Sequence, residues 1–364
     1  MISGEQAMLL YEGSDLHELM RRAGDEARRR HGDRERTYVV ERNINYTNVC
    51  GARCSFCAFS VSGGDERAYV LDGDAVAEKV GELVAVGGTQ ILLQGGLDVG
   101  LDMAWYEGML RGIRERFGGV HIHAFSPPEV VFLAERSGLG VEGVLRRLQE
   151  AGLASLPGGG AEILVDRVRG RISPGKCNSE QWLEVMRQAH RLGMCTTATM
   201  MFGHVETLGE RIEHLERLRA LQAESLARRE QADEGGYFTA FTCWPFQSGG
   251  TRLGRRLAGE GGWTAASGYE YLRMNALSRL YLDNFANIQA SWPTQGVGIA
   301  QLALWGGCND AGSLMMEENV VAAAGTVYRL RLEELRGLIG QAGFEPLQRD
   351  YYYRPVGREG AAGV

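Results

Sequence analysis

Short apolar segments alternate with longer amphipathic segments along most of this 364-residue chain. Runs that predict buried strands lie at residues 38–44, 89–94, 121–125, 161–165, 196–202, 237–246, 287–292 and 301–305. Patterns that predict helices lie at 72–86, 101–117, 128–137, 141–151, 179–192, 207–227, 265–282, 312–324 and 331–342. Strands that alternate with helices form right-handed βαβ units, so an α/β protein with a parallel sheet is predicted. About eight such units predict a (β/α)8 TIM-type barrel, and an open, partial barrel is the structural alternative.

The ends of the chain depart from this alternation. Residues 1–36 are helical and charged, which predicts an N-terminal helical extension. We expect the barrel to cover residues 37–325, and a C-terminal helical extension and tail to cover 326–364. Short low-complexity stretches at 228–236, 249–262 and 357–364 are expected to be surface loops or frayed ends.

Charge and composition exclude several classes of protein. The net charge of −7 and the pI of about 5.7 are not those of a nucleic-acid-binding surface. No apolar run approaches the roughly 18 to 20 residues that span a bilayer. The N-terminus lacks the basic and apolar regions of a secretory signal. Seven cysteines in a large chain do not resemble a secreted disulfide scaffold, so we expect a cytoplasmic protein that binds neither nucleic acid nor membranes.

The cysteines divide into one group and four single residues. Cys50, Cys54 and Cys57 form a C-x3-C-x2-C motif directly after the first predicted strand, where barrel active sites form. Three closely spaced thiolates can hold three irons of a 4Fe–4S cubane and leave the fourth iron open to a ligand. The single residues are expected to pack in the core as small apolar side chains, namely Cys177, Cys195, Cys243 and Cys308.

A structural zinc site is the alternative interpretation of the motif. Zinc requires a fourth Cys or His, and none lies within ten residues of the group. His31, in the charged N-terminal helix, is the next candidate. A structural metal-binding protein is therefore the non-enzymatic hypothesis, and the cluster is favoured. Phe56, between the last two cysteines, is placed where a ring could pack near an adenine.

The motif and its flanks resemble the radical S-adenosylmethionine (SAM) superfamily, within the branch that makes menaquinone by the futalosine route and the deazaflavin cofactor. Nearly the whole chain is similar to the cyclic dehypoxanthinyl futalosine synthases. The segments that carry the likeness are NINYTNVCGARCSFCAF (43–59), GGTQILLQGGLD (87–98), HIHAFSPPE (121–129), PGGGAEILVDRVRGRISPGKC (157–177), TTATMMFGHVET (196–207), WPFQ (244–247), NIQASWPTQG (287–296) and SLMMEENVV (313–321). The chain departs from the family's pattern at Ser60-Val61, at Cys243, at 298–300 and at 305–308, which affects details of the pocket.

The resemblance implies a 4Fe–4S cluster and SAM as cofactors. It implies that Gln94, Gly95 and Gly96 bind the methionyl ammonium of SAM and that Glu162 also holds SAM. One of the basic residues at 167, 169, 171 and 176 is expected to clamp the SAM carboxylate. The implied reaction is the cyclisation of dehypoxanthine futalosine after a 5′-deoxyadenosyl radical abstracts hydrogen from C4′. A flavodoxin or ferredoxin is the expected kind of electron donor. The sister aminofutalosine synthase and a deazaflavin-ring synthase are the enzymatic alternatives.

Other polar residues follow the predicted strands and are candidates for the site. His204 and Glu206, just after the strand at 196–202, are expected acid–base groups, with a structural role at the helix entry as the equal alternative. His121 and His123 alternate along a strand and are expected to form a structural pair on one face. The candidates for substrate contacts are Ser126, Glu129, Trp292, Gln295, Asn309 and Glu317.

Overall fold

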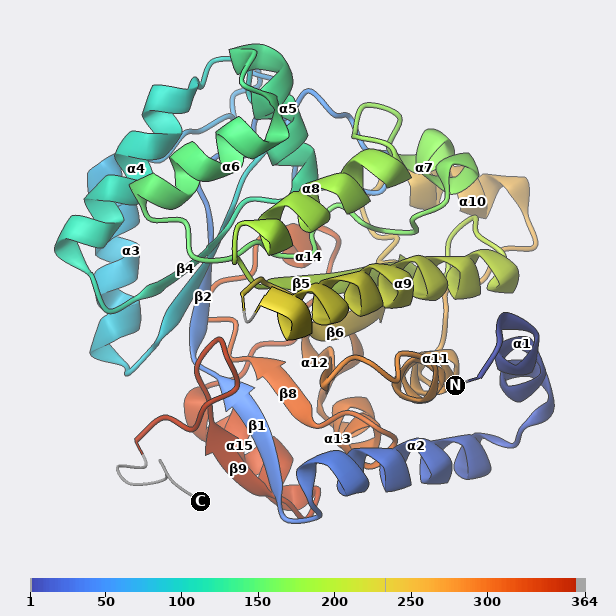
Figure 1. The fold of residues 1–364 in the computed structure, drawn as a ribbon. Helices are drawn as coiled ribbons and strands as arrows, with labels where there is room; N and C mark the ends of the chain where they lie inside the picture. The colour runs from blue at the N-terminus through green and yellow to red at the C-terminus, as the bar shows by residue number, and fades with distance from the viewer. Residues whose placement is uncertain (1, 233, 358–364) are drawn as a thin grey trace.

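The computed structural model describes residues 2–232 and 234–357 as an α/β barrel of the TIM type with helical extensions at both ends (Figure 1). Parallel strands surround a common interior and helices cover them from outside. The strands are β1 (Glu35–Val39), β2 (Glu41–Asn45), β3 (Gln90–Gln94), β4 (His121–Ala124), β5 (Thr196–Phe202), β6 (Phe238–Pro245), β7 (Asn287–Gln289), β8 (Asp310–Ser313) and β9 (Glu345–Gln348).

The strands form two sheets that meet at two places. One sheet has the order β5-β6-β7-β8-β1-β9 and the other has the order β2-β3-β4. β1 and β2 are halves of one extended segment that is interrupted at Val40, so the first meeting point is a continuous chain. At the second, Ser155 bridges to His123 of β4 and Leu156 bridges to Thr196 of β5. The two sheets are therefore joined by a continuous chain at one meeting point and by isolated bridges at the other.

The predicted fourth strand at 161–165 is wrong, because isolated bridges at Ser155 and Leu156 take its place. Side chains form hydrogen bonds with backbone C=O and N–H groups of this apolar run. The guanidinium of Arg169 donates to the carbonyl of Ala161 at 2.7 Å, and the N–H of Leu164 donates to His214 Nδ1 at 3.0 Å. A segment whose backbone is held in this way cannot form a regular ladder with a neighbouring strand.

The predicted eighth strand at 301–305 is also wrong, because this segment belongs to helix α13 (Val297–Trp305). Ala300, Ala303 and Leu304 are buried while Leu302 and Trp305 are exposed, which is the spacing of a helix face rather than of a strand. The true strand β8 (Asp310–Ser313) overlaps the start of the range 312–324, in which a helix is predicted but only α14 (Val320–Ala323) is helical.

The helices otherwise follow the predicted pattern. The side chains of Asp72, Asp102 and Asn178 cap the N-termini of α3 (Gly73–Ala85), α4 (Met103–Arg116) and α8 (Ser179–Arg191). The stretch 249–262, expected to be a loop, contains α10 (Arg252–Glu260), and α9 (Leu208–Ala232) extends into 228–236. The helices are α1 (Gly4–Gly13), α2 (Leu16–His31), α3 (Gly73–Ala85), α4 (Met103–Arg116), α5 (Pro127–Ser137), α6 (Gly140–Ala151), α7 (Asp166–Ile172), α8 (Ser179–Arg191), α9 (Leu208–Ala232), α10 (Arg252–Glu260), α11 (Gly268–Tyr281), α12 (Trp292–Gln295), α13, α14 (Val320–Ala323) and α15 (Leu332–Gln341).

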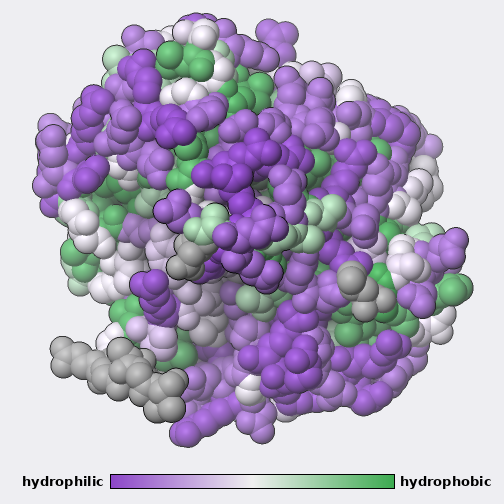
Figure 2. Space-filling view, in the orientation of Figure 1, coloured by the Kyte–Doolittle hydropathy of each residue, from purple (hydrophilic) through white to green (hydrophobic). Residues whose placement is uncertain are grey.

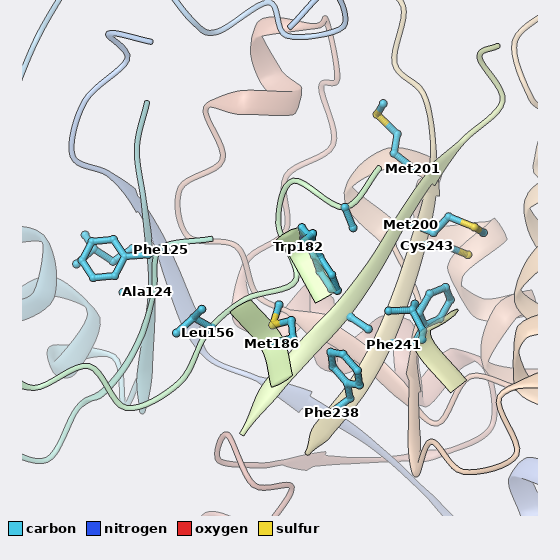
Figure 3. Packing of buried hydrophobic residues seen from close by; sticks show 14 of the residues in the cluster. Ala124, Phe125, Leu156, Trp182, Met186, Met200, Met201, Phe238, Phe241 and Cys243 are labelled. Carbon is cyan, nitrogen blue, oxygen red and sulfur yellow. The ribbon is translucent and has the colours of Figure 1, made fainter. Parts of the chain in front are cut away.

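The hydrophobic core fills the space between the strands and their helices. Figure 3 shows Trp182 of α8 and Phe238 of β6, whose rings stack with their centres 6.4 Å apart, together with Met200, Phe241 and Cys243 of the same core. The four single cysteines are all buried, as expected for core residues. On the face seen in Figure 2 most of the surface is hydrophilic. Within the described residues no helix is long and apolar enough to span a membrane.

The chain after α15 returns to the barrel and closes its floor, which the sequence did not predict. β9 pairs in parallel with β1, and the next residues enter the end of the barrel where the strands begin. Arg349 forms a buried ion pair with Asp310 of β8, with the guanidinium Nε 2.6 Å from Oδ2. The ring of Tyr351 stacks on His121 at 4.2 Å. The part of the tail at 358–364 lies outside the described residues.

The predicted histidine pair has the expected structural setting. His121 Nε2 and His123 Nδ1 each lie 2.7 Å from the hydroxyl oxygen of Ser155. Burial lowers the pKa of His121 to about 4 and the pKa of His123 well below its usual value. Both rings are therefore neutral near pH 7 and help hold the bridge between β4 and β5.

Candidate active site

A cavity of about 440 Å³ occupies the interior of the barrel. At the carboxyl ends of the strands its lining includes Cys50, Cys54 and Cys57. At the opposite end the lining includes Arg349 and Tyr351 from the segment that closes the floor. The cavity therefore joins the three predicted cluster ligands to the enclosed space where a barrel enzyme binds its substrate.

The cysteine loop is held against the turn after β3 by backbone contacts. The N–H of Gly51 donates to the carbonyl of Leu97 at 2.9 Å, and the N–H of Leu97 points to Cys50 Sγ at 3.4 Å. A Cβ atom on Gly96 would lie 2.0 Å from the carbonyl oxygen of Val49. Only glycine at position 96 allows this close approach, so the second glycine of the predicted Gly95-Gly96 pair shapes the cysteine loop.

The three thiols suit a 4Fe–4S cluster. Within the described residues no three Cys, His, Asp or Glu side chains lie close enough together to hold a single metal ion. A cubane places its protein ligands on different irons, so Cys50, Cys54 and Cys57 need not converge on one point. Burial raises the pKa of the Cys54 thiol to about 12, opposed by the charge of Lys176. Iron coordination would ionise the thiol, because a bound cation reverses the effect of burial.

Glu162 lies in the cavity wall with an incompletely satisfied carboxylate. Its backbone has φ of 42°, in the left-handed region, directly after the three-glycine run. Lys176 Nζ donates to Oε1 at 3.0 Å, whereas Oε2 is buried and has no hydrogen-bond partner among the described residues. The ammonium of Lys176 also lies 5.1 Å from the centre of the Phe56 ring. Arg169 Nη1 lies 3.7 Å from Oε2, within ion-pair range but without a hydrogen bond, so Oε2 can still accept from a ligand that donates hydroxyl groups.

The four basic residues at 167–176 divide into different roles. Arg167 pairs with Glu210, and Arg171 is exposed. Arg169 is buried and donates to the carbonyls of residues 160, 161 and 177. Lys176 lines the cavity beside the cysteines. Its position makes Lys176 the residue of this group that can meet a carboxylate in the cavity.

Glu129, after β4, faces the turn that carries Gln94 and Gly95. It accepts hydrogen bonds from the hydroxyls of Tyr46 and Ser126 and from the N–H of Gly95, the last at 3.2 Å. Burial raises the pKa of Glu129 to about 7, and these bonds oppose the rise. Ser126, Glu129, Gln94 and Gly95 all line the cavity, so the structure brings these predicted residues together.

His204 and Glu206 form a different arrangement after β5. Both side chains are fully buried, with His204 Nδ1 2.9 Å from Glu206 Oε2. Glu206 also accepts from the N–H of Gly203 at 2.5 Å and from Arg211 Nε at 2.8 Å. Burial would raise the pKa of Glu206, but His204 and Arg211 outweigh it and lower the pKa to about 2. Among the described residues that line the cavity neither His204 nor Glu206 is found, and their contacts hold the β5–α9 turn.

The late-strand candidates do not gather at one place in the barrel. Trp292 lines the cavity and donates its indole N–H to the carbonyl of Ser313 at 2.9 Å. Gln295 donates to the neighbouring carbonyl of Thr294. Asn309, before β8, accepts from the guanidinium of Arg279, and Glu317 accepts from Lys79 Nζ at 2.7 Å. Within the described lining residues, Trp292 is the one member of this set.

Two family models match the chain in adjoining regions. Residues 44–218 match the radical SAM superfamily, and residues 235–359 match the CofH/MqnC C-terminal region. The cyclic dehypoxanthine futalosine synthase of Halalkalibacterium halodurans is 42% identical over 98% of this chain and 91% of its own length. The chain belongs to the CofH/MqnC family of radical SAM enzymes.

One further relative and one solved structure define what sequence identity and fold can each decide. The 5-amino-6-(D-ribitylamino)uracil–L-tyrosine 4-hydroxyphenyl transferase of Archaeoglobus fulgidus is also 42% identical, over 91% of this chain and 92% of its own length. Identity therefore does not separate the two activities. The crystal structure of methylornithine synthase has a TM-score of 0.69 at 18% identity and covers 95% of this chain and 94% of its own, which supports the fold.

As a radical SAM enzyme, this protein uses a 4Fe–4S cluster and SAM. The structure adds cavity residues that the sequence analysis missed, namely Glu41, Asn43, Gln90, Glu318, Arg349 and Tyr351. A signal was present in β2, because residues 41, 43 and 45 are polar at every second position and therefore share one face. In a barrel strand such a face points to the interior, where an aliphatic core would otherwise be expected.

Proposed function

We propose that this enzyme cyclises dehypoxanthine futalosine to cyclic dehypoxanthinyl futalosine in menaquinone biosynthesis. Support comes from the 42% identical synthase and from segments after β4, β5 and β7 that resemble this family. Bound cluster and SAM supply a 5′-deoxyadenosyl radical. The chain's task is to hold the substrate ribose close to that radical and to exclude other hydrogen donors.

The observation that carries the proposal is a pair of unpaired amide oxygens inside the cavity. Gln90 donates its amide N–H to Glu41, and Asn43 donates to Glu318 at 3.2 Å. Both amides therefore turn their carbonyl oxygens away from these carboxyl groups. Among the described residues, Asn43 Oδ1 and Gln90 Oε1 are buried and have no hydrogen-bond partner.

Buried amide oxygens require donors, and sugar hydroxyls are suitable donors. Gln90 of β3 lies opposite Glu41 of β2, so Asn43 is its diagonal neighbour, about 8 Å away at Cα from the usual strand spacings. One ribose that donates two hydroxyl groups spans such a gap. We therefore assign the ribose of the substrate to this part of β2 and β3, below the cysteine loop.

The other cavity residues take roles around this position. Cys50, Cys54 and Cys57 hold the cluster. Glu162 and Lys176 bind the polar groups of SAM, and the turn at residues 94–96 binds its methionyl ammonium. Phe56 packs near its adenine, and Trp292 and the segment at 349–353 enclose the substrate. The seven free cysteines support a reducing, cytoplasmic setting, and we propose a reduced flavodoxin or ferredoxin as electron donor.

The decisive experiment is anaerobic turnover with SAM, a reductant and dehypoxanthine futalosine carrying deuterium at C4′. We expect free 5′-deoxyadenosine that contains the deuterium and a product two hydrogens lighter than the unlabelled substrate. Label retained in the product, or covalent attachment of the adenosyl group, would overturn the cyclase assignment in favour of the aminofutalosine synthase. Turnover with tyrosine and 5-amino-6-ribitylaminouracil instead would assign the transferase activity.

The unpaired amide oxygens are tested separately with Gln90→Met and Asn43→Leu. Each variant should raise KM for dehypoxanthine futalosine about fivefold, the effect of one lost hydrogen bond of roughly 1 kcal/mol, and keep its iron content. Asn284→Leu is the matched control, because its amide oxygen is also unpaired among the described residues but lies outside the cavity lining. Equal kinetics for all three variants would place the ribose elsewhere.

A further inference from the structure

Exposed arginines surround the outer side of the cysteine loop in a protein with a net charge of −7. Arg53 lies within the loop, and Arg171 lies in α7. Arg252, Arg255 and Arg256 project from α10, and all five side chains are exposed. We call these five residues the basic rim. A positive patch on an acidic protein marks a surface with a distinct partner preference.

Backbone contacts join the parts of the basic rim to one another. The N–H of Ser55, between two of the cysteines, donates to the carbonyl of Ile172 of α7 at 2.7 Å. The carbonyl of Ser55 accepts from the N–H of Leu253 of α10, also at 2.7 Å. The guanidinium of Arg252 donates to the carbonyl of Arg53. Helices α7 and α10 therefore both contact the cysteine loop, and Figure 1 shows the two helices near each other.

The charges of the basic rim are largely unneutralised. Within the described residues Arg256 reaches Glu260 at 3.7 Å, and no carboxylate lies within 4.0 Å of the other four arginines. Arg21 and Arg29 of α2 are different, because they form close pairs with carboxylates one helical turn away. Charges without a partner in the chain can pair with one across an interface.

The basic rim lies where an electron donor would have to bind. Each reductive cleavage of SAM consumes one electron, which must reach the cluster from outside. Gly51 and Arg53 are exposed, and Cys50 and Cys57 are partly exposed. The loop at 50–57, which carries the cluster ligands, therefore lies at the surface. An electron-transfer protein bound to this loop would be close to the cluster.

We infer that the basic rim docks a small acidic electron-transfer protein that reduces the cluster. Opposite charges steer such a partner and set its orientation, and salt weakens the encounter. The inference rests on membership in the radical SAM superfamily rather than on the cyclase reaction. SAM cleavage can be measured with any substrate that supports it, so failure of the proposed function would leave this surface assignment intact.

The test compares two reductants in the full-length, cluster-loaded protein. The variant carries Arg171→Glu, Arg255→Glu and Arg256→Glu, which leaves Arg53 and Arg252 with their contacts at the loop. The rate of SAM cleavage is measured with enzymatically reduced flavodoxin and with photoreduced 5-deazariboflavin, a small neutral reductant. We expect the flavodoxin-driven rate to fall at least tenfold at low salt and the deazariboflavin-driven rate to stay within twofold.

A second triple variant controls for the change in net charge. Arg22→Glu, Arg114→Glu and Arg146→Glu alter α2, α4 and α6, and these residues are exposed in the structure. This control should keep most of the flavodoxin-driven rate. For the unmodified protein, raising salt from about 50 to 500 mM should slow flavodoxin-driven cleavage several-fold and leave the other reductant unaffected. Equal losses in the two triple variants, or a salt-independent flavodoxin rate, would overturn the inference.

Discussion

The turns after β4 and β5 each carry a buried glutamate, and the two carboxyl groups behave in opposite ways. Glu129 accepts from two hydroxyls and one backbone N–H, all of them uncharged, and its pKa is raised to about 7. Glu206 accepts from the guanidinium of Arg211 and from the backbone N–H groups of Gly203 and His204, and its pKa is lowered to about 2. Burial raises a carboxyl pKa unless a cation compensates for the lost water.

This difference indicates that Glu129 belongs to a ligand site and that Glu206 has a structural role. Glu206 has its counter-charge inside the protein and needs nothing further. Glu129 lines the cavity and, above pH 7, presents a negative charge that the chain only partly compensates, through Lys176 at a distance. The methionyl ammonium and sulfonium of SAM are cations of the kind that such a carboxylate would favour. Sequence position alone makes the two residues equivalent, and the neighbouring charges distinguish them.

The largest effect is expected for Glu206→Gln. Breaking a buried ion pair typically costs about 3 to 5 kcal/mol, because the partner charge stays buried. The free energy of unfolding, measured in urea, should fall by this amount, with SAM cleavage by the folded fraction unchanged. Glu270→Gln, at the partly exposed end of the same Arg211, should cost less. A stable Glu206→Gln protein that cannot cleave SAM would instead give Glu206 a catalytic role.

The same pair predicts how stability depends on pH. Because the pKa of Glu206 is lower in the folded state than its reference value of 4.5, its contribution is fully present above pH 4.5. The contribution is lost as the pH falls from 4.5 towards 2. The difference in unfolding free energy between the unmodified protein and Glu206→Gln should therefore shrink over this range.

A smaller effect is expected for Glu129→Gln. The affinity for SAM, measured by calorimetry, should rise about tenfold between pH 6 and pH 8 as Glu129 ionises, and the variant should lose this rise. Because the folded pKa is raised, the ligand-free protein should also lose stability as the pH rises from 4.5 to 7, and the variant should not. Glu107→Gln, at a buried carboxylate outside the cavity, is the control. A pH-dependent affinity retained in Glu129→Gln would assign the ionisation to another group.

The smallest effect is expected for Tyr46→Phe. The hydroxyl of Tyr46 donates to Glu129 and favours its charged form. Losing a hydrogen bond of about 1 kcal/mol should raise the pKa of Glu129 by less than one unit. The pH at which SAM affinity rises should move upwards by that amount, with the plateau unchanged. A shift to lower pH would mean that Tyr46 does not stabilise the carboxylate.

The sequence predicted the parts of the fold in which local pattern and tertiary setting agree. Strand–helix alternation and the C-x3-C-x2-C loop after the first strand are of this kind. The run at 161–165 looked like a strand because it is apolar, yet Arg169 and His214 occupy its backbone groups. The strand β8 has the sequence DAGS, too short and too rich in small residues to be recognised, and its neighbours on both sides define it.

The candidate site was predictable where glycine and cysteine residues constrain the backbone. It was less predictable where the site depends on the direction in which a side chain points. Glu317 and Glu318 are adjacent, and the sequence analysis selected Glu317. Arg42 and Lys79 draw Glu317 outwards, and Glu318 enters the cavity. The pairing of Glu206 with Arg211 likewise depends on how a helix begins after β5. Such choices are set by partners distant in the sequence, which a single chain does not reveal.

The floor of the barrel has a consequence for biosynthesis. Its closing contacts, Arg349 with Asp310 and Tyr353 with Gln289, come from residues translated about three hundred positions after the first strand. A nascent chain that already has its cysteine loop still has an interior open to water at the opposite end. These contacts form only once the segment at 349–353 has been made, so the interior is closed at that end late in synthesis.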